Sequence, residues 1–398
     1  MRRREQIGLQ RALVGSLGHV KGFGGSEWRA ALERLNSLVE NAVTLGELPE
    51  DPLDSFSRLR TLWINNLFAS KGEVHLDRAE HALAIAEDQN AIVPIVFGHD
   101  MMAVSLFHTG AFVQSRHHLD RALALYDPVE HHSEAMRFGD DPRPAILVQR
   151  SRTLWHLGYP DAALADAINA LASARASGWV PSLLNVLAVV EKVYLFLGDY
   201  KAANAALEEL GAVADKKGAV AWKGGETIGR ARLFALTRKA KEAVEVLTSF
   251  TDAAQRATGT TLYAPFNLYC LAHAHAELGQ FDEAWRCIGE AVGTMEKTKE
   301  EWCEAEVYRT AGEIALKLLE PDAAKAEAYF ERALTVARQQ QAKSWELVAA
   351  MSMARLWRDQ GKPQQARELL APVYSWFTEG FDTRDLKEAK AMLDALAP

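Results

Sequence analysis

The chain has 398 residues, a formal net charge of −8, 48% hydrophobic residues and 25% charged residues. These proportions are those of a soluble globular protein. The acidic balance argues against a nucleic-acid partner, because a protein that binds nucleic acid needs a basic surface to neutralise phosphates. The sequence has no run of about 18 uninterrupted apolar residues, so no membrane span is predicted.

The N-terminal segment MRRREQIGLQ is basic, but the apolar run of a secretion signal does not follow it. The three cysteines, Cys270, Cys287 and Cys303, form no CxxC pair, and we interpret them as buried reduced thiols. Together these features predict a cytoplasmic protein.

Amphipathic patterns predict helices over 5–17 and 27–45, separated by the turn KGFGGS, with Ser26 as the N-cap of the second helix. The segment LPEDP then breaks the pattern before the next helix, which is expected to end near Gly72. We predict that residues 1–53 form N-terminal helices that cap the rest of the molecule.

From residue 54 onward a two-helix unit repeats. A glycine marks the turn between the two helices in six units, and another residue takes its place in two units. Successive turns are 38, 48, 40, 40, 41, 42 and 40 residues apart, and a fixed period near 40 is typical of helical solenoids. The turn positions are Gly72, Gly110, Gly158, Gly198, Arg238, Gly279, Pro321 and Gly361.

Small side chains recur five positions after the turn in seven units, on one face of the second helix. Such residues let two antiparallel helices approach closely. The one interval of 48 residues contains DPVEHHSEAMRFGDDPRP, residues 127–144, which we expect to be a long connection. The small residues are Ser115, Ala163, Ala203, Ala243, Ala284, Ala326 and Ala366.

The last predicted helix, over 383–396, is rich in charge, as expected for the solvated end of a repeat stack. We therefore predict an all-α fold, an α-α superhelix (solenoid) of about eight helical hairpins. The repeats are assigned to residues 54–380 and a C-terminal capping helix to residues 381–398.

This pattern resembles tetratricopeptide repeats, in a longer form near 40 residues. Two stretches resemble more specifically the C-terminal region of bacterial multidomain class III adenylate cyclases, in which a cyclase domain and a regulatory P-loop ATPase precede the helical region. They are GDDPRPAILVQRSRTLWHLGYPDAAL and RALTVARQQQAKSWEL, the latter followed by ARLWRDQGKPQQARELLAPVYSWFTEGFDTRDLKEAK. The resemblance implies a regulatory and interaction module without the cyclase and ATPase domains.

Candidate chemistry is sparse. The glycine clusters at 22–26 and 223–230 lack the preceding strand of a nucleotide-binding loop, and no G-x-x-x-x-G-K-[ST] motif occurs, so we interpret both as hairpin turns. Four histidines near the long connection lack the spacing of a zinc site and are interpreted as surface residues, whereas His275 is expected to be packed and hydrogen-bonded. We therefore predict a non-enzymatic protein without a metal or cofactor. The four histidines are His117, His118, His131 and His132.

A row of basic or potentially basic residues follows the repeat. The position six residues before each turn should point into the concave face of the solenoid, and in five units it holds Arg152, Lys192, Arg232, His273 and Arg355. Because solenoids bind partners on this face and clustered charge selects partners, we predict that the row binds an acidic protein or peptide. The alternative is that these long side chains simply cover helix surface with their stems.

The predicted function is a non-catalytic tetratricopeptide-repeat scaffold for protein–protein interaction in signalling or transcriptional regulation. Two alternatives remain open. In the first alternative the chain is a small-molecule (inducer) sensor arm of a regulatory ATPase, which an enclosed apolar pocket in the groove would favour. In the second it is the non-catalytic C-terminal part of an adenylate cyclase. The sequence does not indicate an oligomeric state.

Overall fold

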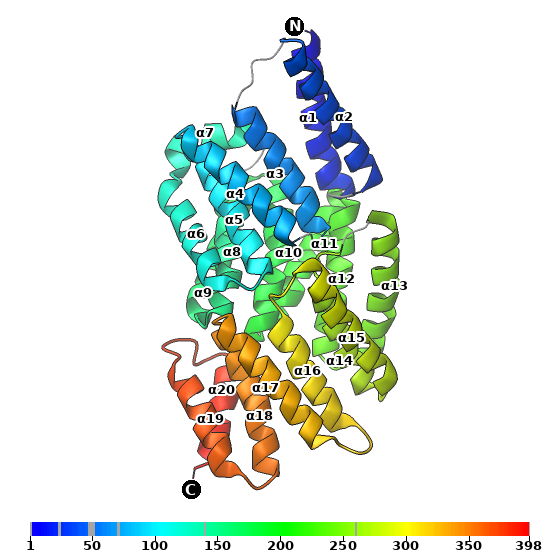
Figure 1. Ribbon diagram of the computed structural model, residues 1–398, viewed down its shortest axis with the longest axis vertical. Coiled ribbons are helices and arrows are strands. Elements are labelled where there is room, and N and C mark those ends of the chain that lie inside the picture. Colours follow the sequence, from blue (N-terminus) through cyan, green and yellow to red (C-terminus); the bar gives the residue numbers. More distant parts are fainter. Residues whose placement is uncertain are drawn as a thin grey trace.

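The structure, a computed structural model, describes residues 2–22, 25–46, 52–69, 72–138, 141–258 and 261–397. Within these ranges the chain forms twenty helices, α1–α20, and no strand (Figure 1). Sixteen of them form eight consecutive hairpins. The first helices of the hairpins are α3 (Pro52–Phe68), α5 (Ile92–His108), α8 (Pro142–His156), α10 (Val180–Leu197), α12 (Val220–Leu236), α14 (Ala264–Glu277), α16 (Glu304–Lys317) and α18 (Lys343–Asp359).

The second helices complete the pairs, and four further helices lie outside them. The second helices are α4 (Gly72–Asp88), α6 (Phe112–Leu125), α9 (Pro160–Ser177), α11 (Tyr200–Lys217), α13 (Ala240–Thr258), α15 (Phe281–Thr298), α17 (Ala323–Gln339) and α19 (Pro363–Ser375). The additional helices are α1 (Arg2–Lys21), α2 (Ser26–Thr44), α7 (Pro128–Arg137) and α20 (Arg384–Ala395).

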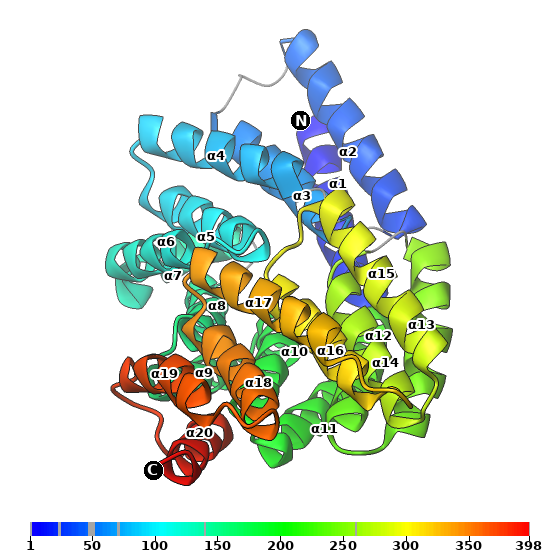
Figure 2. The ribbon, with the colours of Figure 1, turned by 60° about the horizontal axis from the view of Figure 1, so that its bottom comes forward.

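The first helices line the inside of the superhelix. Consecutive first helices pack on one another, as α8 does on α10 and α14 on α16, whereas each second helix packs mainly on its own partner and on the next first helix. Most residues of α5 and α14 are accordingly buried, and α6 and α15 bury one face. Figure 2 shows how these helices follow one another along the chain, from blue at the N-terminus to red at the C-terminus.

The small residues of the repeat close each hairpin, as predicted. All seven second-helix positions are fully buried at 0% exposure. Where a residue at this contact is a serine, its buried hydroxyl forms a hydrogen bond across the hairpin. The Ser115 hydroxyl donates to the carbonyl of Ala103 at 2.8 Å, and the Ser151 hydroxyl donates to the carbonyl of Ala163 at 2.6 Å. Each bond joins the two helices of one hairpin, where a larger side chain would push them apart.

The predicted turns are confirmed in seven of the eight hairpins, including the one at Pro321, which lies between the end of α16 and the start of α17. Gly110, Gly158, Gly198, Gly279 and Gly361 adopt left-handed backbone conformations, with φ between 74° and 87°, and Arg238 takes the same region with φ of 60°. This conformation ends the first helix and favours glycine. Gly72 was wrongly placed, because α3 already ends at Phe68 and Gly72 begins α4.

Three further local predictions were wrong. Ser26 is the first residue of α2, whose N-cap is Gly25 without a side-chain bond. The segment 127–144 contains α7, which begins because the Asp127 carboxylate accepts the N–H of Val129 at 2.7 Å and Pro128 occupies the first helical position. The segment 223–230 lies inside α12, not in a turn.

Gly229 of α12 serves packing instead. A Cβ on Gly229 would lie 2.5 Å from the side chain of Leu207, so the glycine lets α11 and α12 approach closely. In the cluster at 22–26, Gly22 has φ of 97° at the end of α1, as a turn requires, and residues 23 and 24 lie outside the described residues. Helix α1 packs on α12, so the N-terminal hairpin contacts the fifth hairpin.

The later hairpins pack back onto the earlier ones. The segment before α14 contacts the end of α3, where the Thr261 N–H donates to the carbonyl of Phe68 at 3.1 Å. The segment before α16 contacts the end of α5, where the Glu301 N–H donates to the carbonyl of His108 at 2.8 Å. At the start of α18, the Ser344 hydroxyl donates to the carbonyl of Trp155 near the end of α8.

These contacts follow one rule: the loop that leaves a hairpin packs on the turn of the hairpin four units earlier. After α19, Arg384 of α20 donates to the hydroxyl of Tyr200 in the fourth hairpin, and the loop before it bonds to the third hairpin, where the Gly380 N–H donates to Asp161. Two turns of the superhelix are therefore stacked on each other: α18 packs on α8, and Figure 2 shows α17 and α18 beside α8 and α9.

Aromatic side chains fill the space between the stacked turns. Trp302, which is 0% exposed, and Trp345 enter from the second half of the chain. The Trp302 ring lies 5.7 Å from that of Phe107, and the Trp345 ring lies 4.8 Å from that of Trp155 in an edge-to-face arrangement. Such aromatic pairs add to the stabilisation from burial. The inside of the first four hairpins is thus a packed core.

Helix α10 is central to this core. It is the described helix that is long and apolar enough to cross a membrane by length and composition, but 56% of it is buried inside the fold. It packs on α8, α9, α11 and α12, and it carries the adjacent charged residues Glu191 and Lys192, both buried. These features are those of a core helix in a globular fold.

Candidate functional site on the inner surface

The structure divides the predicted row of basic residues into two groups. Arg152, Lys192 and Arg232, on three consecutive first helices, lie together in the interior and are 1%, 5% and 4% exposed. His273 on α14 and Arg355 on α18 are only partly buried. Each of the five side chains is on a first helix, but the two groups have different surroundings.

Arg152 is held by aromatic and neutral partners. Its guanidinium lies 3.6 Å from the centre of the Phe107 ring and donates to the hydroxyl of Tyr263 at 2.9 Å and to the side chain of Gln149 at 2.6 Å. Burial lowers the pKa of Arg152, and the neighbouring Tyr263 opposes that effect. A cation over an aromatic face without solvent is strongly stabilised.

Asp100 lies close enough to Arg152 to be influenced by its charge. Burial raises the pKa of the Asp100 carboxyl to about 6, although the charges of Arg60 and Arg152 favour the ionised form. Desolvation therefore outweighs attraction at this carboxyl. The group is poised to change its charge just below neutral pH.

Glu191 joins the other two cations of the buried group. Its Oε1 lies 2.8 Å from the Lys192 ammonium and 3.2 Å from the guanidinium of Arg232. Arg232 also donates from Nε to the side chain of Asn267 at 2.8 Å. Charges this deeply buried require such partners, because a lone ion in the interior carries a large desolvation cost.

Two loops from the later hairpins cover this group. Tyr263, just before α14, places its ring 4.9 Å from the Lys192 ammonium and donates its N–H to Glu300 at 2.9 Å. Glu300, just before α16, also accepts from the Trp302 indole at 3.0 Å and is 2% exposed. The chain's own residues thus occupy the inner surface of the first four hairpins.

The inner surface of the later hairpins is more accessible. Arg355 forms an ion pair at 2.5 Å with Glu388 of α20, and the two side chains are 34% and 47% exposed. Arg309 pairs with Glu306 and Glu313, both at 2.7 Å. The cations of this region are therefore each matched by a carboxylate.

His273 lies on α14 in the same region. Burial lowers its pKa, and the neighbouring charges of Lys317 and Arg309 lower it further. The imidazole is therefore neutral at neutral pH, and of the two accessible members of the row it is Arg355 that carries a charge.

The other histidines considered in the sequence analysis pack against neighbouring side chains. His275 is 6% exposed and its Nδ1 lies 2.7 Å from the side chain of Gln280, as predicted. His118 lies with its Nδ1 2.9 Å from that of His99, and burial lowers the pKa of both rings. Throughout the described part of the chain, no three histidine, cysteine, aspartate or glutamate side chains are grouped to hold a metal ion.

The cysteines are buried free thiols, as predicted. Burial raises the pKa of Cys270 to about 12 and that of Cys287 to about 11. Thiols with raised pKa values are poor nucleophiles at neutral pH.

Comparisons with known proteins identify the fold. No protein-family model matches the sequence, and no curated protein matches it either. Among solved structures, a Rap protein complexed with Competence and Sporulation Factor aligns over 99% of this chain and 100% of its own, with a TM-score of 0.60 and 12% identity. The fold is that of a tetratricopeptide-like helical solenoid, so the predicted fold class is confirmed.

Two further structures support the same assignment. The Rap conjugation gene regulator of plasmid pLS20, in complex with the Phr* peptide, has a TM-score of 0.55 and 10% identity over 98% of this chain and 97% of its own. Cut9–Hcn1 of the APC/C has a TM-score of 0.50 and 13% identity over 94% of this chain and 73% of that chain. At these identities the likeness concerns the fold alone.

Proposed function

We propose that this chain is a non-catalytic scaffold that binds a partner protein or peptide on its inner surface, and that it acts in cytoplasmic signalling or transcriptional regulation. The observation that supports the proposal is that Arg355, a cation of the repeated first-helix position, stays accessible beside Glu388, whereas Arg152, Lys192 and Arg232 of the same row are buried. Solenoids present such a concave surface to their partners. The two Rap structures with the same fold were solved with Competence and Sporulation Factor and with the Phr* peptide, which supports a peptide or protein ligand.

The accessible part of this surface is formed by α14, α16 and α18. In this part of the surface, Arg355 is the partly exposed cation of the predicted row. Its carboxylate partner, Glu388, is half exposed. An acidic segment of a partner would replace Glu388 at Arg355, at little cost because an exposed ion pair contributes only about 0–1 kcal/mol. Arg152, Lys192 and Arg232 keep their own partners in this arrangement.

Opposite charge changes at one ion pair test this proposal. Glu388→Gln releases Arg355 and should tighten binding of a fluorescent glutamate-rich peptide about two- to fivefold at low salt. Arg355→Glu should weaken binding about tenfold. Fluorescence anisotropy at low and moderate salt measures both, with a glutamine-substituted peptide as the neutral probe.

The matched control is Arg286→Glu on the outer helix α15, where Arg286 pairs with exposed Glu283 and Glu290. It changes the net charge of the protein by the same amount as Arg355→Glu and should leave binding unchanged. Equal affinity of all variants for the acidic peptide, or equal affinity of the acidic and neutral peptides, would contradict the proposal.

The alternative functions rest on the resemblance to bacterial adenylate cyclases. In these alternatives the chain is either an inducer-sensing arm of a regulatory ATPase or the C-terminal part of a cyclase. Sequencing the gene upstream of the first codon tests it. An open frame that encodes a P-loop supports the alternative, and an in-frame stop codon contradicts it.

A further inference from the structure

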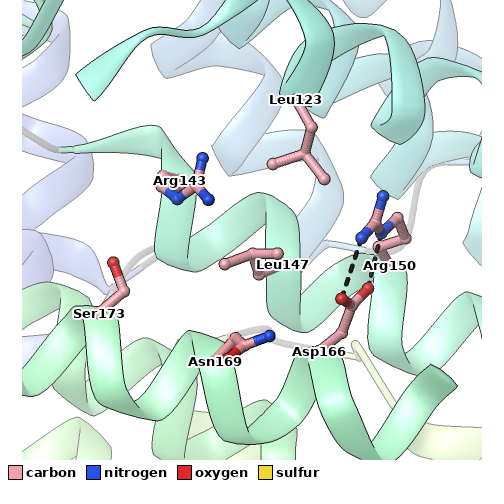
Figure 3. A pocket seen from close by; sticks show the side chains of 7 residues that line it. All are labelled: Leu123, Arg143, Leu147, Arg150, Asp166, Asn169 and Ser173. Carbon is pink, nitrogen blue, oxygen red and sulfur yellow. Dashed lines mark hydrogen bonds and ion pairs between the residues drawn. The ribbon is translucent and has the colours of Figure 1, made fainter. Parts of the chain in front are cut away.

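A pocket lies on the outer surface of the molecule, between α6 and α9, with α8 as its floor. Its volume is about 480 Å³, and it is open to solvent. This volume is within the usual range for small-molecule sites. Figure 3 shows Arg143 and Ser173 at one end, Arg150 and Asp166 at the other, and Leu123 and Leu147 between them. Asn169 completes the lining.

The charged pair at one end of the pocket is already engaged. Arg150 donates from Nε to one Asp166 oxygen at 2.6 Å and from Nη2 to the other at 3.0 Å, and from Nη1 to Asp120 at 3.0 Å. This two-pronged arrangement is the strongest form of an arginine–carboxylate pair. Three of the five N–H donors of Arg150 are therefore engaged, and the Asp166 charge is compensated.

Arg143 at the opposite end is different. Its guanidinium is half-buried, and no hydrogen bond or ion pair links it to any other described residue. No hydrogen bond links the side chain of exposed Asn169 or of partly buried Ser173 to another described residue either. Arginine carries five N–H donors, so the pocket contains a concentration of unused hydrogen-bonding capacity.

The backbone holds Arg143 in a defined place. It is the second residue of α8, and its N–H donates to the capping carboxylate of Asp141 at 3.0 Å. The first turn of a helix is also where backbone dipoles favour an anion. Asp166 and Asp120 both pair with Arg150, so Arg143 is the lining cation that has no carboxylate partner among the described residues.

We propose that this pocket binds a small organic carboxylate with an apolar body. The Arg143 guanidinium receives the carboxylate, Asn169 and Ser173 donate further hydrogen bonds, and Leu123 and Leu147 contact the body of the ligand. A planar guanidinium matches a carboxylate in two-pronged geometry. The contact offered by Leu123 and Leu147 favours such a ligand over inorganic phosphate, which has no apolar part. The site lies on the outer surface and is independent of the inner-surface scaffold function.

Phenylacetate is a suitable probe, with phenylacetamide as its uncharged counterpart and inorganic phosphate as an anion without an apolar body. Ligand-observed NMR and titration calorimetry measure binding to the full chain. We expect phenylacetate to bind at least about tenfold more tightly than either of the other probes, because a charge-assisted hydrogen bond contributes about 1.5–3 kcal/mol.

Variants localise the binding. Arg143→Gln removes the charge without breaking any recorded contact and should weaken phenylacetate binding at least about tenfold. Arg121→Gln removes an exposed arginine of α6 that does not line the pocket and should have no effect, and the same is expected of Arg355→Glu. Thermal melting of each variant checks that the fold is retained.

Any of four results would overturn the proposal. The first three are no measurable phenylacetate binding, unchanged binding in Arg143→Gln, and equal binding of phenylacetamide. The fourth is tighter binding of phosphate than of phenylacetate, which would rule out the organic carboxylate. None of these outcomes bears on the inner-surface scaffold function, because its test uses a peptide and residues of α18 and α20.

Discussion

Gly158 and Gly361 hold the same position in the turns of their hairpins, yet their surroundings differ. Both have left-handed backbones, with φ of 87° and 75°. A Cβ on Gly158 would lie 2.6 Å from the Trp376 ring and 2.7 Å from the Lys343 side chain, whereas nothing lies within 4 Å of the same position at Gly361. Each glycine ends the first helix of its hairpin. Gly158 also leaves room for the next turn of the superhelix to pack against it, whereas Gly361 has no such neighbour.

The inner row shows the same contrast between the halves. In the third to fifth hairpins its three cations are buried, as Lys192 is beneath Tyr263 from a later loop. In the eighth hairpin Arg355 remains partly exposed beside Glu388. One repeat pattern thus forms a core where superhelical turns are stacked and a surface where they are not.

The largest expected effect concerns charge removal in the two halves. Glu191→Gln leaves Lys192 and Arg232 without their carboxylate in the interior and should lower the free energy of unfolding by about 3–5 kcal/mol. Glu388→Gln removes an exposed partner and should change it by less than about 1 kcal/mol. Urea unfolding of both variants measures the difference. Equal effects would contradict the contrast between the halves.

The turn glycines provide the next comparison. Gly361→Ala should lower the free energy of unfolding by about 1–2 kcal/mol, the cost of a left-handed backbone for a residue with a Cβ. Gly158→Ala should lower it by about 1–3 kcal/mol more, because the added methyl group overpacks the contact with Trp376. Thermal and urea unfolding test this, and the comparison fails if the two substitutions are equally destabilising.

Asp100 gives the smallest effect and a pH dependence. Its folded pKa of about 6 is above the ordinary value of 3.8 for an aspartate, so the folded state binds the proton more tightly and stability should fall as pH rises from about 4 to 6. The difference amounts to at most about 3 kcal/mol.

Asp100→Asn isolates this contribution. The variant should be more stable than the wild type at pH 7, and the two should converge towards pH 4. Urea unfolding of both proteins across this range measures the difference. A gap that stays constant with pH would show that the Asp100 carboxyl does not titrate in this range.

Much of the fold could be predicted from the sequence because its signals are local. Small residues such as Ala163 mark the close contact within a hairpin, and a glycine such as Gly158 marks its turn. Errors arose where one signal has two uses. Gly225 and Gly229 were interpreted as a turn although they lie in α12, and the proline-rich segment 127–144 hid a helix that begins with its own cap at Asp127.

The candidate site could be predicted only in part. The repeat correctly places Arg152 and Arg232 on the inner side of first helices, because that depends on spacing within a hairpin. Their cover by Tyr263 and Glu300 depends on the pitch of the superhelix, which joins hairpins four units apart and has no local sequence signal. The Arg143 pocket likewise requires α6 and α9, which come from different hairpins.

The stacking of the two superhelical turns is the central claim, and hydrogen–deuterium exchange tests it most directly. The segment 299–303 before α16 lies between the turns, and the Glu301 N–H is bonded to the carbonyl of His108. Its amides should exchange as slowly as those in the middle of α8. Exchange as fast as in the exposed segment 318–322 would show that the later hairpins do not pack on the earlier ones.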